Sequence, residues 1–314
     1  MLQQTRAEVV ADYWTRFLRR FPTVSALAAA DEDDVLALWS GLGYYRRARA
    51  LLAAARTIAT EHGGKLPADP AALAALPGFG PYTTGAVASI AFGLAVPLVD
   101  GNVARVLTRL RCIEGVPAAG PAKRAVWSLA AELLFEPDPG TWNQALMELG
   151  ARLCSPTNPT CEACPIATHC QAHAENRTTE LPTRPPKKTS IEVSTEALIL
   201  GTPGGWLLTR RPGTGRNPGL FELPTREASR PAQDLWPADW ALPDFAALYA
   251  EAHAHGTFRH AITHHRITVH ARRIDGNPAL LARLASQSAY DLVPRARAND
   301  LALSGLTKKL LKAT

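Results

Sequence analysis

Apolar residues recur at helical spacing through the first half of the chain. Intervals of three and four place them on one face, which is the pattern of an amphipathic helix packed on a core. The clearest runs are Val9, Val10, Tyr13, Trp14, Phe17 and Leu18, and then Val35, Leu36, Leu38 and Trp39. Asp31 precedes three further acidic residues and marks a helix start, because carboxylates suit the positive end of the helix dipole. We therefore predict that residues 1–174 are all-α.

The pattern changes after residue 174. Residues 175–192 carry three prolines and few apolar side chains, which is typical of a linker. Strand-like segments follow at 196–200, 205–210 and 266–272. A closing helix is predicted for the stretch after Pro294, running to Thr314. The chain is thus predicted to be multidomain, with an all-α domain followed by an α/β domain at residues 193–314, which makes the whole chain α then α+β.

Charge adds little to this picture. The 314 residues carry a net charge of +6, but residues 1–174 hold 15 basic and 15 acidic side chains, so the excess lies beyond them. Net charge alone is therefore weak evidence for nucleic acid, and any contact with DNA by the first half must come from local groups. No stretch is apolar and long enough to span a membrane, and no signal peptide is evident. We expect a cytoplasmic protein.

Four of the five cysteines fall within 17 residues, at Cys154, Cys161, Cys164 and Cys170. Such a group can close around one soft-metal centre, whereas a pair of disulfides in a secreted domain fits a chain of this length poorly. The spacing C-x6-C-x2-C-x5-C lacks the paired knuckles of zinc ribbons. It resembles the 4Fe–4S loop of the endonuclease III and MutY family of DNA glycosylases. The fifth, Cys112, is predicted to be a buried apolar residue.

The segment from Leu76 to Ser89 supports this resemblance. Gly78 and Gly80 permit a tight turn before a helix start, which is a natural seat for a phosphate oxygen. The segment resembles the helix–hairpin–helix of DNA glycosylases, which grips the DNA backbone without reading sequence. Members that also cleave the strand carry a lysine nucleophile where this chain has Tyr82. A phenol cannot form a Schiff base, so a monofunctional glycosylase is indicated.

Further site residues follow from the resemblance. Asp100, in Asp-Gly-Asn, matches the family's catalytic aspartate, which stabilises the positive charge that develops on the sugar as the base leaves, and Asn102 would orient groups beside it. Tyr44 matches a wedge inserted into the base stack. The resemblance also implies that Gln4 intercalates opposite the flipped base, that Thr5 lies near the lesion guanine and that Glu148 hydrogen-bonds the adenine edge.

The second half resembles a Nudix domain in the strand–turn–strand segment 205–224. The acidic motif that holds catalytic magnesium in Nudix hydrolases is absent, so a binding domain is expected. The segment Phe258–His264 resembles the loop by which MutY proteins recognise 8-oxoguanine, with Thr263 and His264 as the contacting residues. Ile262 stands where the family has an aromatic ring, so we expect weaker discrimination than is typical.

The resemblance to the MutY family of adenine DNA glycosylases thus covers nearly the whole chain. It implies a helix–hairpin–helix glycosylase domain at 1–174, including the iron–sulfur loop 154–170, then a linker and a Nudix-like domain. It implies removal of adenine opposite 8-oxoguanine or guanine in double-stranded DNA, one 4Fe–4S cluster on the four cysteines, and a monomer associated with the nucleoid. The alternatives are an endonuclease III-like enzyme for oxidised pyrimidines and a catalytically dead lesion-binding protein.

One departure concerns the general acid. In the family a glutamate lies two residues before the Met-Leu-Gln-Gln-Thr segment, and this chain begins at that Met1. We expect the upstream reading frame to encode the glutamate. The 314-residue chain is then expected to bind lesion DNA but to excise adenine very poorly, because a positioned general acid contributes roughly 10²–10⁴-fold in rate.

Overall fold

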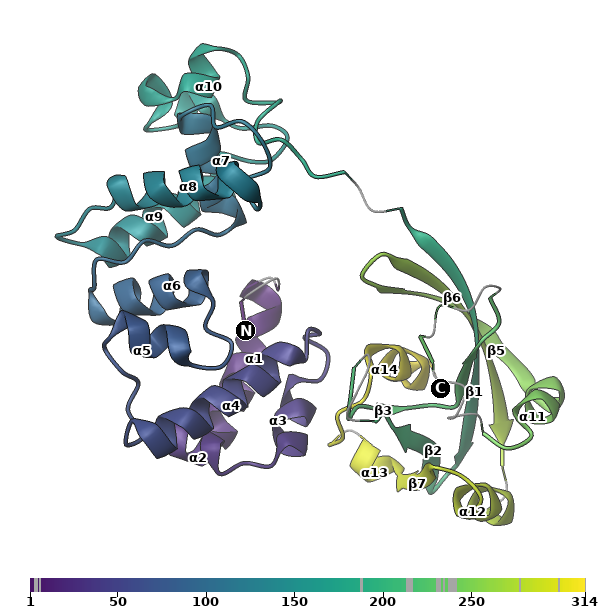
Figure 1. Cartoon of the computed structure of the whole chain (residues 1–314). Coiled ribbons are helices and arrows are strands. Elements are labelled where there is room, and N and C mark those ends of the chain that lie inside the picture. The colour runs from purple at the N-terminus through teal and green to yellow at the C-terminus, as the bar shows by residue number, and fades with distance from the viewer. Residues whose placement is uncertain are drawn as a thin grey trace. The chain divides into compact units, whose positions relative to one another are not determined.

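The structure is a computed structural model that describes residues 1–2, 5, 7–186, 189–212, 217–229, 233, 235–236, 242–276, 278–298 and 300–313. It contains two compact units (Figure 1). One consists of Met1–Arg56 together with Lys188–Thr314, and the other of Thr57–Lys187. No helix in the described ranges has both the length and the apolar character needed to cross a bilayer.

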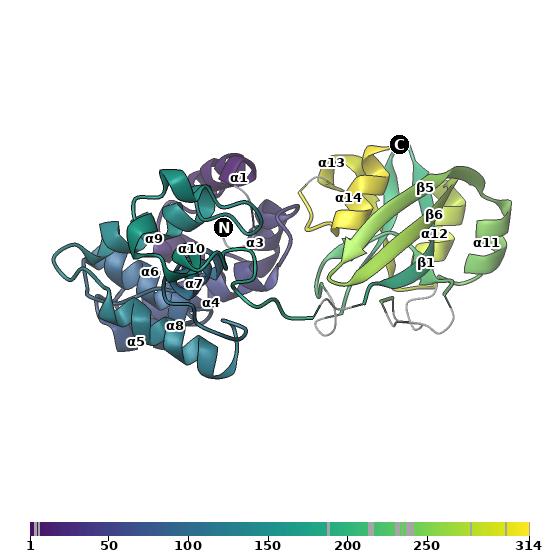
Figure 2. The same cartoon turned by 90° about the horizontal axis from the view of Figure 1, so that it is seen from above.

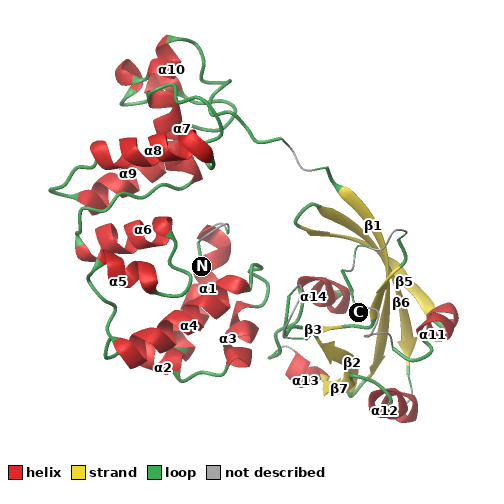
Figure 3. Cartoon of the chain, in the orientation of Figure 1, coloured by secondary structure: helices red, strands yellow, loops and turns green. Residues whose placement is uncertain are grey.

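The Thr57–Lys187 unit is helical (Figure 3). Its α-helices are α5 (Pro70–Ala75), α6 (Pro81–Phe92), α7 (Gly101–Leu110), α8 (Gly120–Glu132), α9 (Pro139–Arg152) and α10 (Gln171–Ala174), with short 3₁₀ turns at Cys161–Ala163 and Ala167–His169. The core lies where α7 contacts α8 and α9, around Leu98, Val103, Leu107 and Val126. Tyr82, Asp100, Asn102 and the four clustered cysteines all lie within this unit.

Aspartates begin three of these helices. The carboxylates of Asp69, Asp100 and Asp138 accept hydrogen bonds from the backbone N–H groups of Ala72, Val103 and Thr141, at 2.7, 2.7 and 3.1 Å. This is the usual way in which a side chain satisfies the free N–H groups of a first turn. The helices therefore start where the sequence places an Asp before Pro or Gly.

The other unit begins with four helices, α1 (Ala7–Arg20), α2 (Val24–Ala28), α3 (Glu32–Trp39) and the first part of α4 (Arg46–Glu61). The predicted helix start at Asp31 is confirmed as the N-cap of α3. The core of these helices, with Phe17, Leu36 and Trp39, also contains Leu220 and Ala302 from the second half of the chain. The first helices therefore share a core with residues that lie far away in sequence.

The second half forms a seven-stranded mixed sheet (Figures 1 and 2). The strands are β1 (Ile191–Thr202), β2 (Gly205–Arg210), β3 (Phe221–Glu222), β4 (Thr225–Glu227), β5 (His253–Ile262), β6 (His265–Asp275) and β7 (Tyr290–Pro294). The order is β3-β2-β1-β6-β5, with β4 paired to β1 and β7 to β2. β1 and β6 run parallel from Ile191 opposite His265 to Gly201 opposite Asp275. All other pairs are antiparallel.

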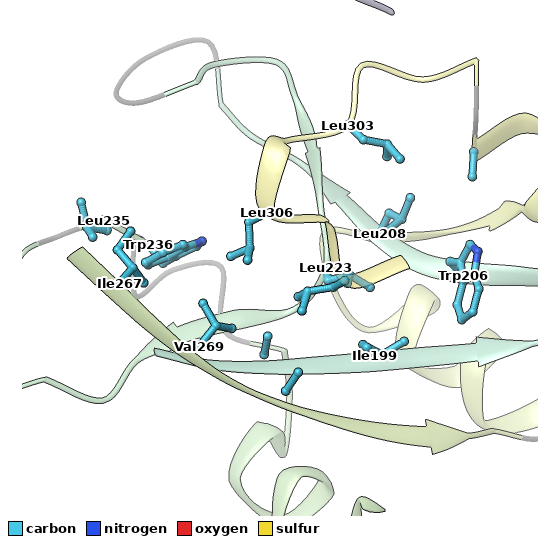
Figure 4. Packing of buried hydrophobic residues seen from close by; sticks show 14 of the residues in the cluster. Ile199, Trp206, Leu208, Leu223, Leu235, Trp236, Ile267, Val269, Leu303 and Leu306 are labelled. Carbon is cyan, nitrogen blue, oxygen red and sulfur yellow. The ribbon is translucent and has the colours of Figure 1, made fainter. Parts of the chain in front are cut away.

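Helices cover both faces of this sheet. Ile199 of β1 packs with Leu306 and Leu310 of α14 (Gly305–Lys312). Leu198 and Leu200 point to the opposite face and pack with α11 (Phe245–Glu251) and α12 (Pro278–Ser286). Neighbouring residues of a strand point to opposite faces, which explains the continuous burial of this part of β1. Figure 4 shows the first of these clusters, with Leu303 and Leu306 beside Leu208 and Leu223.

The three predicted strands lie within β1, β2 and β6, so the change from helices to strands is confirmed. The predicted closing helix is wrong as a single element. It is α13 (Arg295–Ala298) and α14, separated by a segment in which Leu303 pairs with Phe221 and Ser304 caps α14. The predicted linker is not wholly free either, because Leu181 is 2% exposed and its carbonyl accepts a bond from Arg109.

Candidate functional site

Asp100 is held by two hydrogen bonds at the start of α7. Its Oδ1 accepts the N–H of Val103 at 2.7 Å, and its Oδ2 accepts Nδ2 of Asn102 at 3.2 Å. The two donors bond different oxygens of the carboxylate, so its orientation is fixed. The side chain is partly exposed, so one face of the carboxylate remains available to a substrate.

Asn102 connects Asp100 to the cysteine-rich segment through Arg105. Asn102 Oδ1 accepts Nη2 of Arg105 at 3.0 Å, and the same guanidinium donates to the carbonyls of Gly150 and Cys154, both at 2.7 Å. A guanidinium with several acceptors has one orientation, because its donors lie in a fixed plane. The carboxylate is therefore oriented by a network that ends at the backbone of the first clustered cysteine.

Gly150 allows α9 to approach α7 at this network. A methyl group at Gly150 would lie 2.7 Å from Cβ of Asn102 and 2.8 Å from its carbonyl oxygen. Cβ atoms in proteins essentially never approach other atoms this closely. Because the neighbours include backbone atoms of Asn102, they could not simply rotate away. The geometry of Asn102 therefore depends on a residue without a side chain.

Tyr82 lies beside this site in the first turn of α6. Its hydroxyl is 3.7 Å from Sδ of Met147 on α9. Burial raises the pKa of Tyr82, and the negative charge of Asp100 raises it further. The structure therefore places Tyr82 within electrostatic range of Asp100, and the phenol is neutral at physiological pH.

The turn between α5 and α6 has the shape of a hairpin. Gly78 has a φ of +80°, and the N–H of Phe79 bonds the carbonyl of Leu76 at 3.1 Å. Gly80 is the N-cap of α6 without a side-chain hydrogen bond, and nothing lies within 4 Å of where its Cβ would be. An open helix N-terminus of this kind suits a phosphate oxygen. The predicted roles of Gly78 and Gly80 remain predictions.

The four clustered cysteines line one cavity of about 30 Å³. All are reduced, and burial together with the charges of Cys154, Cys170 and Cys164 raises the pKa of Cys161. Within the described residues, no group of three or more His, Cys, Asp or Glu side chains is arranged to hold a metal ion. The cavity shared by the four sulfurs nevertheless fits a group bound by all of them.

Arg109 supplies positive charge to this cavity. It is 1% exposed, and its Nη1 lies 3.2 Å from Sγ of Cys154 and 2.8 Å from the carbonyl of Ser155. A buried guanidinium needs acceptors or negative partners, and a thiolate is one. Cys112 lies outside the cavity; the prediction that it is buried is wrong, because α7 ends before it and it occupies a turn at φ +44°.

Glu148 is not brought to Asp100 and Tyr82. It is 62% exposed and pairs with Arg152 at 2.9 Å, one turn further along α9. It lines a groove with Trp142, Leu146, Arg152 and His169, and neither Asp100 nor Tyr82 lines that groove. Helix α9 thus presents Met147 and Gly150 to the site and turns Glu148 elsewhere.

Two predicted DNA-contacting residues lie in the other unit, beside Arg47. Tyr44 is 60% exposed, with the Arg47 guanidinium 5.4 Å from its ring centroid. Arg47 also donates to Oγ1 of Thr5 at 3.1 Å. The structure therefore brings Tyr44 and Thr5 to the same arginine. Gln4 lies outside the described residues.

Thr263 and His264 form the two-residue turn between β5 and β6, since Ile262 pairs with His265. Thr263 is exposed and has a φ of +54°, which a β-branched residue rarely adopts. Its hydroxyl bonds the carbonyl of Ile262 at 2.7 Å, and the His264 ring lies 4.3 Å from that of His265. Backbone strain of this kind concentrates at functional sites.

The sequence analysis did not predict the roles of Arg105, Arg109 and Gly150 at this site. Arg105 lies three residues after Asn102, a spacing at which side chains of a helix meet, so that signal was present. Arg109 follows Arg105 by one further turn on the same face. Nothing in the sequence distinguished Gly150, because its importance lies in the approach of another helix.

Two family profiles match the chain. The HhH-GPD superfamily of base excision DNA repair proteins matches residues 1–132, and the NUDIX domain matches residues 196–313. An adenine DNA glycosylase of Rattus norvegicus is 39% identical over 243 residues, covering 76% of this chain and 46% of that protein. One of Schizosaccharomyces pombe is 32% identical over 323 residues, covering 86% and 69%. The solved structure of a thermostable thymine-DNA glycosylase is 27% identical, with a TM-score of 0.49 over 55% of this chain and 80% of that one.

Helices joined by an open glycine hairpin, followed by a Nudix-like mixed sheet, define the class as helix–hairpin–helix base excision repair proteins with a second domain. Within that class, the chain belongs to the adenine DNA glycosylase family. It spans about half the length of the rat and human relatives.

Proposed function

We propose that this protein is a DNA glycosylase that removes adenine paired with 8-oxoguanine or guanine by hydrolysing the N-glycosidic bond. The observation that carries the proposal is the Asp100 carboxylate, fixed by Val103 and Asn102 beside Tyr82. A carboxylate held in this way can stabilise the positive charge on the sugar as the base departs. The base must first leave the helix to reach it, as in other base-modifying enzymes.

Tyr82 supports a monofunctional reaction. Strand cleavage by this class of enzyme needs an amine that forms a Schiff base with the sugar, and a phenol has no such chemistry. The raised pKa of Tyr82 also keeps its proton in place. Water then completes the reaction, and the product is an abasic site in an intact strand.

The turn at Thr263 and His264 is the proposed reader of 8-oxoguanine. Its support is the exposed hydroxyl of Thr263 at the tip of the β5–β6 hairpin, held in a strained backbone conformation. The hydroxyl donates its proton to the Ile262 carbonyl, so its oxygen would accept a hydrogen bond from the altered edge of an oxidised purine. The neighbouring Ile262 adds only apolar contact, so we expect modest preference for 8-oxoguanine over guanine.

The test is a single-turnover assay of adenine release from duplexes with adenine opposite 8-oxoguanine or guanine. The 314-residue chain is compared with a chain extended upstream to the glutamate that the family resemblance implies. We expect excision from the extended chain, an intact strand until alkali is added, and no borohydride-trapped adduct. Binding of the duplex without excision by the extended chain would instead support a non-catalytic lesion-binding protein.

The same assay isolates the reading turn. Thr263→Val keeps the shape of the side chain and removes its hydroxyl, so the rate opposite 8-oxoguanine is expected to fall toward the rate opposite guanine. Thr257→Val makes the same change at an exposed position earlier on β5 and is the matched control. Equal preference in both variants and the unchanged chain would remove the turn from the proposal.

We propose that the four cavity-lining cysteines bind one 4Fe–4S cluster. They would supply one thiolate to each iron, with Arg109 offsetting negative charge at Cys154. Bound there, the cluster would order the loop whose backbone carbonyl orients Arg105. Its chemistry is therefore structural in this proposal.

Purified protein is expected to be brown and to contain about four irons per chain. Cys164→Ser is expected to lower the iron content and the visible absorption, because it removes one ligand. Cys112→Ser changes a cysteine outside the cavity and is expected to leave both unchanged. Stoichiometric zinc without iron after anaerobic purification would exclude the cluster.

A further inference from the structure

The turn between α3 and α4 holds an exposed tyrosine in an unusual backbone conformation. Gly41, Gly43 and Tyr44 have φ values of +112°, +68° and +48°. Left-handed conformations suit glycine, but a tyrosine rarely adopts one unless its surroundings impose it. Tyr44 is 60% exposed, whereas the next residue, Tyr45, is buried. Contacts made by other residues must therefore stabilise the backbone conformation of this turn.

The contacts that stabilise the turn are made by Leu303 and Lys308, near the C-terminal end of the sequence. Ser40 Oγ and the Tyr45 hydroxyl, at the two ends of the turn, both donate to the carbonyl of Leu303, at 2.8 and 3.2 Å. Lys308 Nζ donates to the carbonyl of Ser40 at 2.6 Å. Leu303 and Lys308 thus contact the turn at its ends and leave the side chain of Tyr44 exposed.

The Leu303 carbonyl and the Lys308 side chain belong to well-packed parts of the C-terminal domain. Leu303 is buried and lies in the sheet core with Leu306 of α14 (Figure 4). Ser304 caps α14 through the N–H of Thr307 at 3.2 Å. Burial lowers the pKa of Lys308, and the charges of Arg16 and Lys312 lower it further. The hydrogen bond to the carbonyl of Ser40 therefore stabilises an ammonium group that its surroundings disfavour.

Tyr13 of α1 also packs closely against the turn. A side chain at Gly41 would lie 2.2 Å from the hydroxyl of Tyr13, which itself donates to the Ser40 carbonyl at 3.1 Å. The N–H of Gly41 bonds the Tyr45 hydroxyl at 3.3 Å. Helix α1, the turn and the Leu303 carbonyl therefore form one connected set of hydrogen bonds.

We propose that Leu303 and Lys308 are a brace that sets the shape of the Ser40–Tyr45 turn, so that the C-terminal domain positions Tyr44, the tyrosine that the family resemblance implies enters the base stack. Lys308 is a positioning residue, since it acts through the carbonyl of Ser40. The part that concerns DNA rests on the proposed function, whereas the brace itself is a property of the free protein. The C-terminal domain then has a second role besides reading the lesion.

The first test needs no DNA. In Lys308→Met, the amides of residues 41–45 are expected to exchange with solvent at least about tenfold faster than in the unchanged protein, because the turn samples open states more often. Lys308→Arg is expected to restore slow exchange, since it can still donate to the Ser40 carbonyl. Lys312→Met removes the same charge from an exposed position of α14 and keeps the bond from Lys308 to Ser40, so it is expected to leave exchange slow. Equal exchange in Lys308→Met and Lys312→Met would overturn the brace.

The second test uses a duplex with 2-aminopurine beside the lesion, whose fluorescence rises when the stack opens. Lys308→Met is expected to bind the duplex but to give less than half of the fluorescence rise, while its ratio of binding to 8-oxoguanine and guanine duplexes stays the same. An unchanged rise would overturn the role in stacking. If the unchanged protein binds no duplex, the proposed function fails, and hydrogen exchange still decides the brace.

Discussion

Asp100→Asn is expected to abolish adenine excision while leaving the fold and DNA binding intact. Asparagine caps a helix about as well as aspartate, so the bond to the Val103 N–H at 2.7 Å survives. What disappears is the negative charge opposite the developing positive charge of the sugar. Loss of one preorganised electrostatic group costs roughly 10²–10³ in rate, and we expect about 10³-fold or more for a full charge.

The measurement is single-turnover release of adenine by the extended chain, with duplex binding measured in parallel. Asp69→Asn is the matched control, because Asp69 caps α5 through an N–H at the same 2.7 Å and lies at a different helix start. Its rate should be unchanged. Excision by Asp100→Asn at a rate within tenfold of the unchanged chain would show that another group stabilises the transition state.

Gly150→Ala is expected to damage both stability and catalysis through a single methyl group. The methyl would press on Cβ and the carbonyl oxygen of Asn102, at 2.7 and 2.8 Å, and α9 would have to move away from α7. Overpacking of this kind costs about 1–3 kcal/mol of unfolding free energy. Since Asn102 orients Asp100, the excision rate should fall as well.

Urea unfolding followed by circular dichroism gives the stability change, provided that the slope of the transition is unchanged. Gly101→Ala is the control, because nothing lies within 4 Å of that Cβ position. Its unfolding free energy should change by no more than about 0.5 kcal/mol. A Gly150→Ala protein as stable as the control would mean that α7 and α9 adapt without strain.

The sequence predicted local features well. The helix start at Asp31, the change from helices to strands, and the gathering of four cysteines around one space each depend on residues near one another in the chain. The same holds for Asp100 with Asn102, which lie on one helical turn. Tyr82 was assigned by resemblance, and the structure places it near Asp100.

What could not be predicted depends on which elements meet. Helical periodicity shows that α9 is a helix, but not that Gly150 faces α7 while Glu148 pairs with Arg152. The predicted single domain 1–174 is divided because residues 1–56 pack with the second half. Nothing in the sequence singles out the partners in that contact, such as Ser40 and Leu303, since Leu303 contributes only its backbone carbonyl.

The contact between Ser40 and Leu303 also determines when, during synthesis of the chain, the first helices can complete their packing. Ser40 and its acceptor Leu303 are 263 residues apart. At a translation rate of roughly 5–20 residues per second, roughly 13–53 s pass between their emergence from the ribosome. During that interval the apolar face of the first helices, which Leu220 and Ala302 cover in the finished protein, is open to other molecules in the cell. Each newly made chain must protect that face until its last residues arrive.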